Sequence, residues 1–227
     1  MHQSTEIRSF GRKGGRALSP RQQRLLDELL PQLQLDLAKP GPTLAALFTA
    51  PVTATWLEIG FGGSEHMIWQ ATHNPGVGFI GCEPFVDGVV KALTAIDEQH
   101  LGNIRLHADD ARDVLRWLPD ASIDRAFILF PDPWPKARHR KRRLVSGPTL
   151  ALLARVMKSG SELRVGTDIA DYAHTMLAAF EGQSAFVWTA TSPTDWREQG
   201  ADWPVTRYQR KAIREGRRSY FFRFRRV

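Results

Sequence analysis

The segment that most constrains the fold is residues 127–143, FILFPDPWPKARHRKRR. The continuous apolar run that begins at Ala126 is typical of a strand buried on both faces, as in a parallel sheet. Three prolines at alternate positions, the first of them Pro131, then oppose both helix formation and strand pairing. We therefore expect the chain to leave a central strand as a stiff, extended turn. This turn would present Asp132 and Trp134 at the carboxyl end of the strand, where open α/β sheets bind ligands.

Other segments are predicted to complete the sheet. Four apolar runs indicate buried strands: residues 55–59, 77–83, 104–107 and 162–167. Helices are expected between them, one capped by Ser64 and others over residues 84–99 and 146–159. Residues 219–227 alternate aromatic and cationic side chains, which is typical of a half-buried antiparallel strand. The predicted fold is an α/β, doubly wound, mostly parallel sheet with an antiparallel C-terminal strand.

The N-terminal part is expected to form an arm and a helix. Residues 1–17 contain three glycines and no apolar periodicity, which predicts a mobile basic arm. Ser19, the following proline and Gln22 form a capping-box start for a leucine-rich helix that Pro31 is predicted to end. Three prolines and a glycine between residues 39 and 51 mark a linker. The predicted division is therefore an arm and helix over residues 1–38 and a single domain over residues 39–227.

Three strand ends carry residues suited to a nucleoside-containing cofactor. Glycines that include Gly60 and Gly62 follow the first strand and let the backbone approach a ligand closely. Glu83 ends the second strand, where a carboxylate can accept hydrogen bonds from both hydroxyls of a ribose. Asp110 closes the third strand and can accept a bond from an adenine amino group, although spacing alone does not choose between it and Asp109. The same pattern describes NAD(P)-dependent oxidoreductases, but the turn lacks the full G-x-G-x-x-G spacing.

Positive charge is concentrated in three segments. The formal net charge is +7, and residues 8–24, 136–143 and 207–226 contain 21 of the 31 lysines and arginines but a single acid. Segregation on this scale favours a phosphate-binding face, and hence nucleic acid as the partner. The side chains predicted to contact RNA phosphates are Arg138, Arg140, Lys141, Arg142 and Arg143. Trp203 and Tyr208 lie among C-terminal cations, where such rings either stack on bases or pack in a core.

Composition excludes several other classes of protein. Cys82 is the only cysteine, so an internal disulfide and a cysteine-rich metal site are both excluded, and no metal is expected. The N-terminus lacks the apolar core of a signal peptide, and no apolar run approaches the roughly 18 residues of a membrane helix. A cytoplasmic protein without a membrane partner is therefore expected.

Six motifs, in this order, resemble those of the bacterial tRNA (guanine-N7-)-methyltransferases. They are EIGFG at residues 58–62, GCE at 81–83, DA at 110–111, FPDPWPK at 130–136, TD at 167–168 and PVTRY at 204–208. The similarity covers nearly the whole chain, including Arg8-Ser9-Phe10 in the N-terminal arm. The resemblance implies a Rossmann-like methyltransferase fold, S-adenosylmethionine as methyl donor, and guanosine 46 in the variable loop of tRNA as the target.

The resemblance also implies roles for individual residues. The family's cofactor-binding acids correspond to Glu58, Glu83, Asp110 and Asp132, of which Asp132 is also the proposed catalytic residue. The family's substrate-binding positions correspond to Lys136, Asp168, Thr206, Arg207, Tyr208 and Gln209. Ser64 stands where a third glycine is usual, and Gln209 stands where glutamate is usual. The alternatives are methylation of another RNA guanosine and a non-catalytic RNA-binding module on the same fold. The expected partner is tRNA, and no obligate protein partner is inferred.

Overall fold

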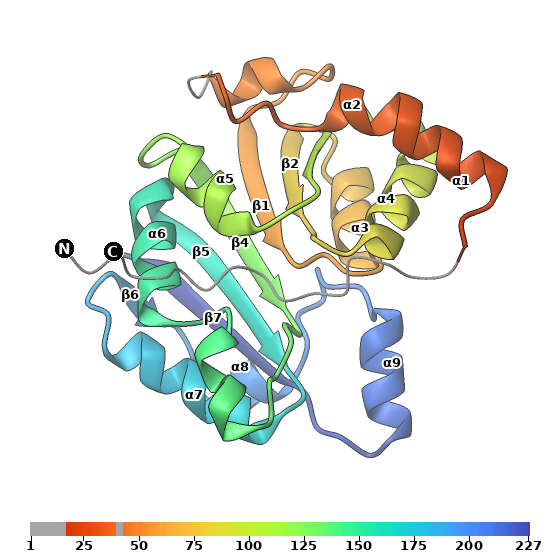
Figure 1. Cartoon of the computed structure of the whole chain (residues 1–227). Helices are drawn as coiled ribbons and strands as arrows, with labels where there is room; N and C mark the ends of the chain where they lie inside the picture. Colours follow the sequence, from red (N-terminus) through yellow and green to blue (C-terminus); the bar gives the residue numbers. More distant parts are fainter. Residues whose placement is uncertain (1–16, 40–42) are drawn as a thin grey trace.

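The computed structural model describes residues 17–39 and 43–227, which are layered around one seven-stranded sheet (Figure 1). The strands follow the order β3-β2-β1-β4-β5-β7-β6 across the sheet. Their bounds are β1 Ala54–Ile59, β2 Val77–Cys82, β3 Ile104–His107, β4 Ile123–Leu129, β5 Met157–Thr167, β6 Phe186–Trp188 and β7 Tyr220–Arg226. The first five strands are parallel, and β7 pairs antiparallel with β5 and β6. The predicted doubly wound sheet with an antiparallel C-terminal strand is therefore confirmed.

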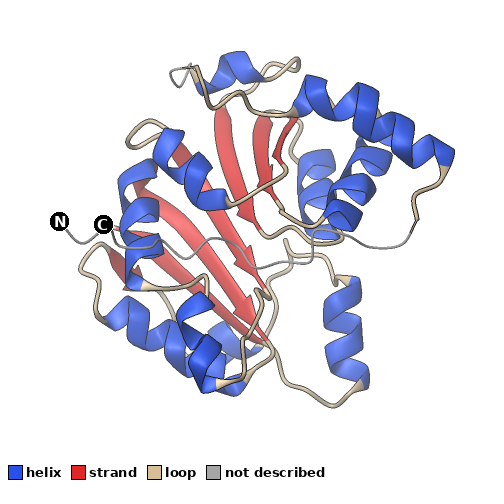
Figure 2. Cartoon of the chain, in the orientation of Figure 1, coloured by secondary structure: helices blue, strands red, loops and turns tan. Residues whose placement is uncertain are grey.

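Helices cover both faces of the sheet because successive side chains of a strand point to opposite faces (Figure 2). One face is covered by α3 Glu65–His73 and α4 Val86–Gln99. The other face is covered by α5 Ala111–Trp117, α6 Gly147–Val156 and α7 Ala170–Glu181. The connections contain the short helices η2 Leu44–Leu47, η3 Ala137–Arg142 and α8 Thr194–Arg197 and the longer α9 Arg207–Arg214. Among the helices that the structure describes, none is long and apolar enough to span a membrane.

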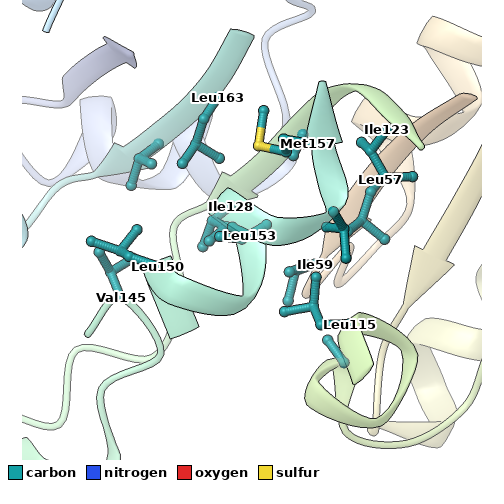
Figure 3. Packing of buried hydrophobic residues seen from close by; sticks show 14 of the residues in the cluster. Leu57, Ile59, Leu115, Ile123, Ile128, Val145, Leu150, Leu153, Met157 and Leu163 are labelled. Carbon is teal, nitrogen blue, oxygen red and sulfur yellow. The ribbon is translucent and has the colours of Figure 1, made fainter. Parts of the chain in front are cut away.

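The larger core lies between the sheet and helices α5, α6 and α7 (Figure 3). Along β4, Ala126 and Ile128 belong to this core, whereas Phe127 between them packs on the opposite face. Leu150 and Leu153, which are three residues apart on α6, are both 0% exposed. Burying one leucine side chain contributes about 1.5–3 kcal/mol. Since the typical net stability of a domain is only about 5–15 kcal/mol, the loss of one such contact is a large fraction of it.

The leucine-rich helix continues to Leu33, so the prediction that it ends at Pro31 is wrong. It consists of α1 Pro20–Arg24, a π-helical segment η1 Leu25–Leu29 and α2 Leu30–Leu33. The capping box at Ser19 is present as predicted. The wider π turn ends where the Leu30 N–H donates to the Leu25 carbonyl, so that Pro31 enters near the start of the next α-helical turn. Proline is tolerated there because no N–H is required of it.

This helix packs against the β3 edge of the sheet. Arg21 forms ion pairs with Asp97 at 2.9 Å and with Glu98 at 2.7 Å, both on α4. After the helix, the Leu35 N–H donates to the Leu106 carbonyl of β3 over 2.9 Å. Nearly all of the predicted basic arm, residues 1–16, lies outside the described residues, as do residues 40–42 of the predicted linker.

The region around β5 also differs from the prediction. The helix expected over residues 146–159 ends at Val156, and β5 begins at Met157 rather than at residue 162. Met157 pairs with Ile123, and the register then shifts before the regular pairing that starts at Glu162. The extra residues form a bulge, so local apolar spacing alone could not distinguish them from a last helical turn. The three-residue strand β6 was not predicted either, because it has no strand-length pattern of its own.

Candidate active site

The carboxyl ends of the central strands meet at one edge of the sheet. The last residues of β1, β2 and β3 pair in register, Ile59 with Cys82 and Cys82 with His107. On the other side, β4 pairs with β1 and β5, with Leu129 of β4 opposite Gly166. The strand order reverses at β1, and crevices at such switch points bind ligands in open α/β sheets. The structure therefore brings all the predicted strand-end residues to one edge.

The turn after β1 leaves open space beside its backbone. Gly60 and Gly62 have φ values of +74° and +52°, in the left-handed region that favours glycine. Apart from the glycine and its two chain neighbours, no atom of the described residues lies within 4 Å of the position that a Cβ would occupy at either residue. Ser64 also has a positive φ, and its hydroxyl donates to the Gly63 carbonyl over 2.7 Å. The prediction that the Ser64 side chain caps α3 is therefore wrong, because that hydroxyl makes no cap bond.

Glu83 holds this turn in place from the end of β2. Its carboxylate accepts bonds from the backbone N–H of Gly62 at 2.8 Å and of Phe85 at 3.0 Å. Burial raises the pKa of Glu83, and the two backbone donors oppose that shift. The negative charges of Asp132 and Glu58 raise the same pKa further, which indicates that these three carboxylates lie within electrostatic reach of one another.

Glu58 and Asp110 are buried acids with close partners. The Glu58 carboxylate lies 2.6 Å from Nδ1 of His66, and both side chains are almost fully buried. Asp110 caps α5 by accepting from the Arg112 N–H at 3.0 Å and binds the Arg112 guanidinium at 2.7 Å. Asp109 is exposed and accepts from the Asp110 N–H at 2.9 Å. Asp110 is therefore buried and already bound to Arg112, whereas Asp109 is open to solvent, and both remain candidates for the adenine amino group.

The proline-containing turn after β4 is not simply extended. Phe130 and Trp134, which flank it, have φ values of +52° and +42°. Left-handed backbone at a non-glycine residue costs about 1–3 kcal/mol and persists only where surrounding contacts impose it. One such contact is the bond from Arg143 Nε to the Pro133 carbonyl at 2.9 Å, and another joins the Phe130 N–H to the Gly166 carbonyl at 2.7 Å. Asp132 lies exposed within this constrained turn.

Arg143 does not contact solvent in the way that we predicted for a phosphate ligand. Its side chain is only 2% exposed, and its guanidinium bonds to Thr175 and Asp171 as well as to Pro133. It also lies 4.7 Å from the ring centroid of Tyr172. Arg143 is therefore a structural clamp on the turn, and its assignment as an RNA contact is corrected.

The remaining cations of residues 136–143 differ in their contacts. Lys136, Arg138 and Lys141 are exposed. Arg140 is exposed but pairs with Asp171 at 2.9 Å. Arg142 is half-buried, with its guanidinium 4.9 Å from the ring centroid of Trp134. Three exposed cations, of which Arg138 also donates to the His139 ring over 3.3 Å, therefore lie directly after the Asp132 turn.

The predicted C-terminal substrate residues lie around the start of α9. Thr206 caps the helix by accepting from the Gln209 N–H at 3.3 Å. The Arg207 N–H donates to Glu65 at the start of α3 over 2.6 Å. Tyr208 is 45% exposed, with its ring 5.5 Å from that of Phe130. Gln209 is buried and donates to Gln199, so the side chain that departs from the family pattern faces a neighbouring loop.

Burial shows how two further residues, Trp203 and Asp168, are placed. Trp203 is 4% exposed and packs against Phe221 and Phe127, so of the two C-terminal rings only Tyr208 is open to a base. Asp168 is buried and binds Arg217 at 2.7 Å. No sequence pattern indicates this pairing, because Arg217 lies among many C-terminal cations and 49 residues from its partner. The same is true of the Glu58–His66 pair.

Comparisons with known proteins agree on the class of enzyme. A family model described as "Putative methyltransferase" matches residues 53–222. The tRNA (guanine-N(7)-)-methyltransferase of Nitrobacter hamburgensis is 49% identical over 96% of this chain and 86% of that protein. The protein of the same name from Hyphomonas neptunium is 49% identical over 96% of this chain and 100% of its own length. The Rhodospirillum rubrum protein, with the same name, is 48% identical over 97% of this chain and 88% of its length.

Solved structures support the fold. One described as "Structure of an Antibiotic Related Methyltransferase" superposes with a TM-score of 0.56 at 18% identity, covering 95% of this chain and 98% of the other. TrmN from Thermus thermophilus gives a TM-score of 0.57 at 17% identity, covering 81% of this chain and 47% of the other. At these identities the likeness concerns the fold alone. The sequence relatives carry the assignment further, and the chain belongs to the tRNA (guanine-N(7)-)-methyltransferase family.

Proposed function

We propose that this protein transfers a methyl group from S-adenosylmethionine to N7 of guanosine 46 in the variable loop of tRNA. The observation that carries the proposal is the convergence, at one sheet edge, of an open glycine turn, buried acids and the exposed Asp132. The chain that builds this edge belongs to the tRNA (guanine-N(7)-)-methyltransferase family.

The residues at this edge fit the proposed methyl donor. The open space beside Gly60 and Gly62 admits a ligand close to the backbone. Glu83, fixed by two backbone donors, is placed to accept ribose hydroxyls, and Asp110 or Asp109 to accept the adenine amino group. Glu58 completes the set of acids. When bound, S-adenosylmethionine supplies an electrophilic methyl group.

The chemistry at guanine N7 requires orientation more than proton transfer. N7 has an in-plane lone pair and carries no proton, so no general base is needed. Positive charge develops on the purine during transfer, and a carboxylate close to the ring stabilises it more than it stabilises the ground state. Asp132 is the proposed catalytic residue in this role, and it also helps to hold the base in line with the donor.

The RNA is proposed to bind along the exposed cations beside the same edge. Extruding a nucleotide from folded tRNA costs a few kcal/mol, and stacking on a ring returns about 1–3 kcal/mol per base. Tyr208 is the exposed ring, and Trp134 is the second candidate. The proposed substrate contacts remain Lys136, Asp168, Thr206, Arg207, Tyr208 and Gln209.

The direct test uses two tRNA transcripts that differ only at position 46. We expect labelled methyl from the donor to enter the transcript with guanosine 46, and cleavage at 7-methylguanosine to map to that nucleotide. The transcript with adenosine 46 should remain unlabelled. Label at another guanosine would support the alternative target, and tight RNA binding without any label would support a non-catalytic module. Thermal stabilisation by NAD but not by S-adenosylhomocysteine would instead favour the oxidoreductase alternative.

A further inference from the structure

Helix α3 contacts both halves of the proposed site. Its first turn follows the glycine turn directly, and His66 in that turn lies 2.6 Å from the Glu58 carboxylate of β1. His66 is 2% exposed, and its ring packs between those of Phe127 at 4.7 Å and Trp203 at 5.6 Å. The imidazole therefore has little freedom to turn away from the carboxylate.

The hydrogen-bond partners fix which ring nitrogen of His66 carries the proton. Gln70, one turn later, lies 2.7 Å from the Asp202 carbonyl, which can only accept, so that the amide nitrogen must face it. The same nitrogen lies 3.2 Å from Nε2 of His66, while the Gln70 oxygen accepts from Asn74 at 3.3 Å. Nε2 of His66 is therefore the acceptor, and Nδ1 carries the hydrogen that is donated to Glu58.

The far end of this chain of bonds is the segment that precedes Thr206. The Asp202 carboxylate is held by both terminal nitrogens of Arg164, at 2.9 Å and 2.7 Å. The next residue, Trp203, packs beside Gly166 on β5, close to Asp168. A second link from α3 reaches the same segment, because Glu65 accepts from the Arg207 N–H at 2.6 Å.

We propose that His66 is a positioning residue that holds Glu58 for the methyl donor and, through Gln70, ties the substrate segment at Thr206 to the same helix. This inference rests on the proposed function, since it assumes that Glu58 binds the donor and that residues 206–209 bind the tRNA. A buried carboxylate that loses its hydrogen-bond donor pays a desolvation penalty. The removal of His66 therefore affects the binding of the methyl donor first. The removal of Gln70 leaves the Glu58–His66 pair in place and affects the RNA side alone.

Three substitutions separate these two effects. His66→Leu removes both bonds, and we expect the Kd for S-adenosylhomocysteine to rise about tenfold while kcat at saturating donor changes less. His66→Asn places an amide N–H where Nδ1–H was but cannot reach Gln70, so donor affinity should be restored while KM for tRNA rises. Gln70→Leu should likewise keep donor affinity and raise KM for tRNA. His73→Leu is the control on the same helix, because within the described part of the chain the His73 ring bonds to the Trp69 carbonyl and stacks on the Trp69 ring, away from Glu58 and Gln70.

Isothermal titration with S-adenosylhomocysteine and steady-state kinetics with tRNA decide the outcome. Wild-type donor affinity in His66→Leu would overturn the first half of the proposal, and wild-type KM for tRNA in both His66→Asn and Gln70→Leu would overturn the second. If His66→Leu does not fold, the first half is decided by comparing the affinity for S-adenosylhomocysteine of His66→Asn with that of Glu58→Gln. Higher affinity in His66→Asn supports the proposal, and equally weak affinity in the two variants overturns it. Failure of the wild-type protein to bind S-adenosylhomocysteine or to methylate tRNA would count against the proposed function instead.

Discussion

Asp132 differs in its surroundings from the buried acids at the site. Glu58, Glu83, Asp110 and Asp168 are buried, and each accepts hydrogen bonds that fix its carboxylate. Asp132 is exposed and makes no side-chain hydrogen bond or ion pair with another described residue. A fixed, buried acid suits the binding of a constant cofactor, whereas an exposed acid on a constrained backbone can meet a base that enters from solvent. This contrast in burial supports the proposal that Asp132, rather than a buried acid, meets the base.

Replacement of Asp132 by asparagine should therefore reduce chemistry and not binding. We expect the single-turnover methylation rate of Asp132→Asn to fall by about a hundredfold or more, the size of effect seen when one preorganised electrostatic contact is lost. Dissociation constants for S-adenosylhomocysteine and tRNA should stay close to wild type. Asp120→Asn makes the same charge change at the opposite end of β4, where the side chain is 77% exposed, and should leave the rate unchanged. An unaltered single-turnover rate in Asp132→Asn would remove its catalytic assignment.

At the scale of the element, the turn after β4 is shaped by contacts far away in sequence. Its three prolines limit the backbone, but they do not produce the left-handed conformations of Phe130 and Trp134. At one end the Phe130 N–H donates to the Gly166 carbonyl of β5. At the other end the Arg143 guanidinium joins the Pro133 carbonyl to Asp171 and Thr175 of α7. The hydrogen bond from Arg143 lowers the pKa of the Asp171 carboxyl group, and the nearby positive charges of Arg143 and Arg140 lower it further, so the pair stays charged to a lower pH than an isolated carboxyl group would allow.

The clamp predicts opposite behaviour for two arginines of residues 136–143. Arg143→Met leaves the Pro133 carbonyl without its donor, and we expect a loss of about 1–3 kcal/mol in unfolding free energy together with slower methylation. Its tRNA affinity should keep the salt dependence of the wild type. Arg138→Met, at an exposed position, should leave stability unchanged and weaken the salt dependence. Urea unfolding measures the stability of each variant, and tRNA binding at several salt concentrations measures its salt dependence. A stable Arg143→Met with weakened salt dependence, beside a destabilised Arg138→Met, would refute the clamp.

The elements that the sequence predicted well are those with a strong local signal. The strands expected over residues 55–59 and 77–83 match β1 and β2 to within one residue, because buried parallel strands are continuous apolar runs. The β5 bulge, β6 and the continuation of the helix past Pro31 depend on pairing or packing with distant segments, so no local pattern reveals them. The site follows the same division. Strand ends located Glu83 and Asp132, whereas the partners His66, Arg217 and Asp171 become visible only in three dimensions.

On the scale of the whole molecule, exposed positive charge lies on two sides of the candidate site. Helix η3 after β4 contributes Arg138 and Lys141, and α9 contributes Arg210 and Arg214, all exposed. Both helices lie beyond the carboxyl ends of β4 and β5 (Figure 1). Other cations of the basic C-terminal segment, such as Arg225, pair along β7 with the opposite end of β5. A tRNA bound at the site would therefore meet η3 and α9 but not the amino-terminal end of the sheet.

Salt dependence of binding tests this geometry. Each phosphate contact contributes about 0.9 to the slope of log affinity against log salt for a duplex, and about 0.7 for a single strand. We therefore expect the magnitude of this slope to decrease by somewhat less than two for the double variant Arg138→Ala with Lys141→Ala. The same decrease is expected for Arg210→Ala with Arg214→Ala. The two losses should add in the quadruple variant, because one RNA covers both helices at once. Lys158→Ala with Arg225→Ala removes two exposed cations away from the carboxyl end of β5, one of them paired with Asp124 at 2.6 Å, and should leave the slope unchanged. An equal loss in that control would mean that net charge, rather than a defined RNA face, governs binding.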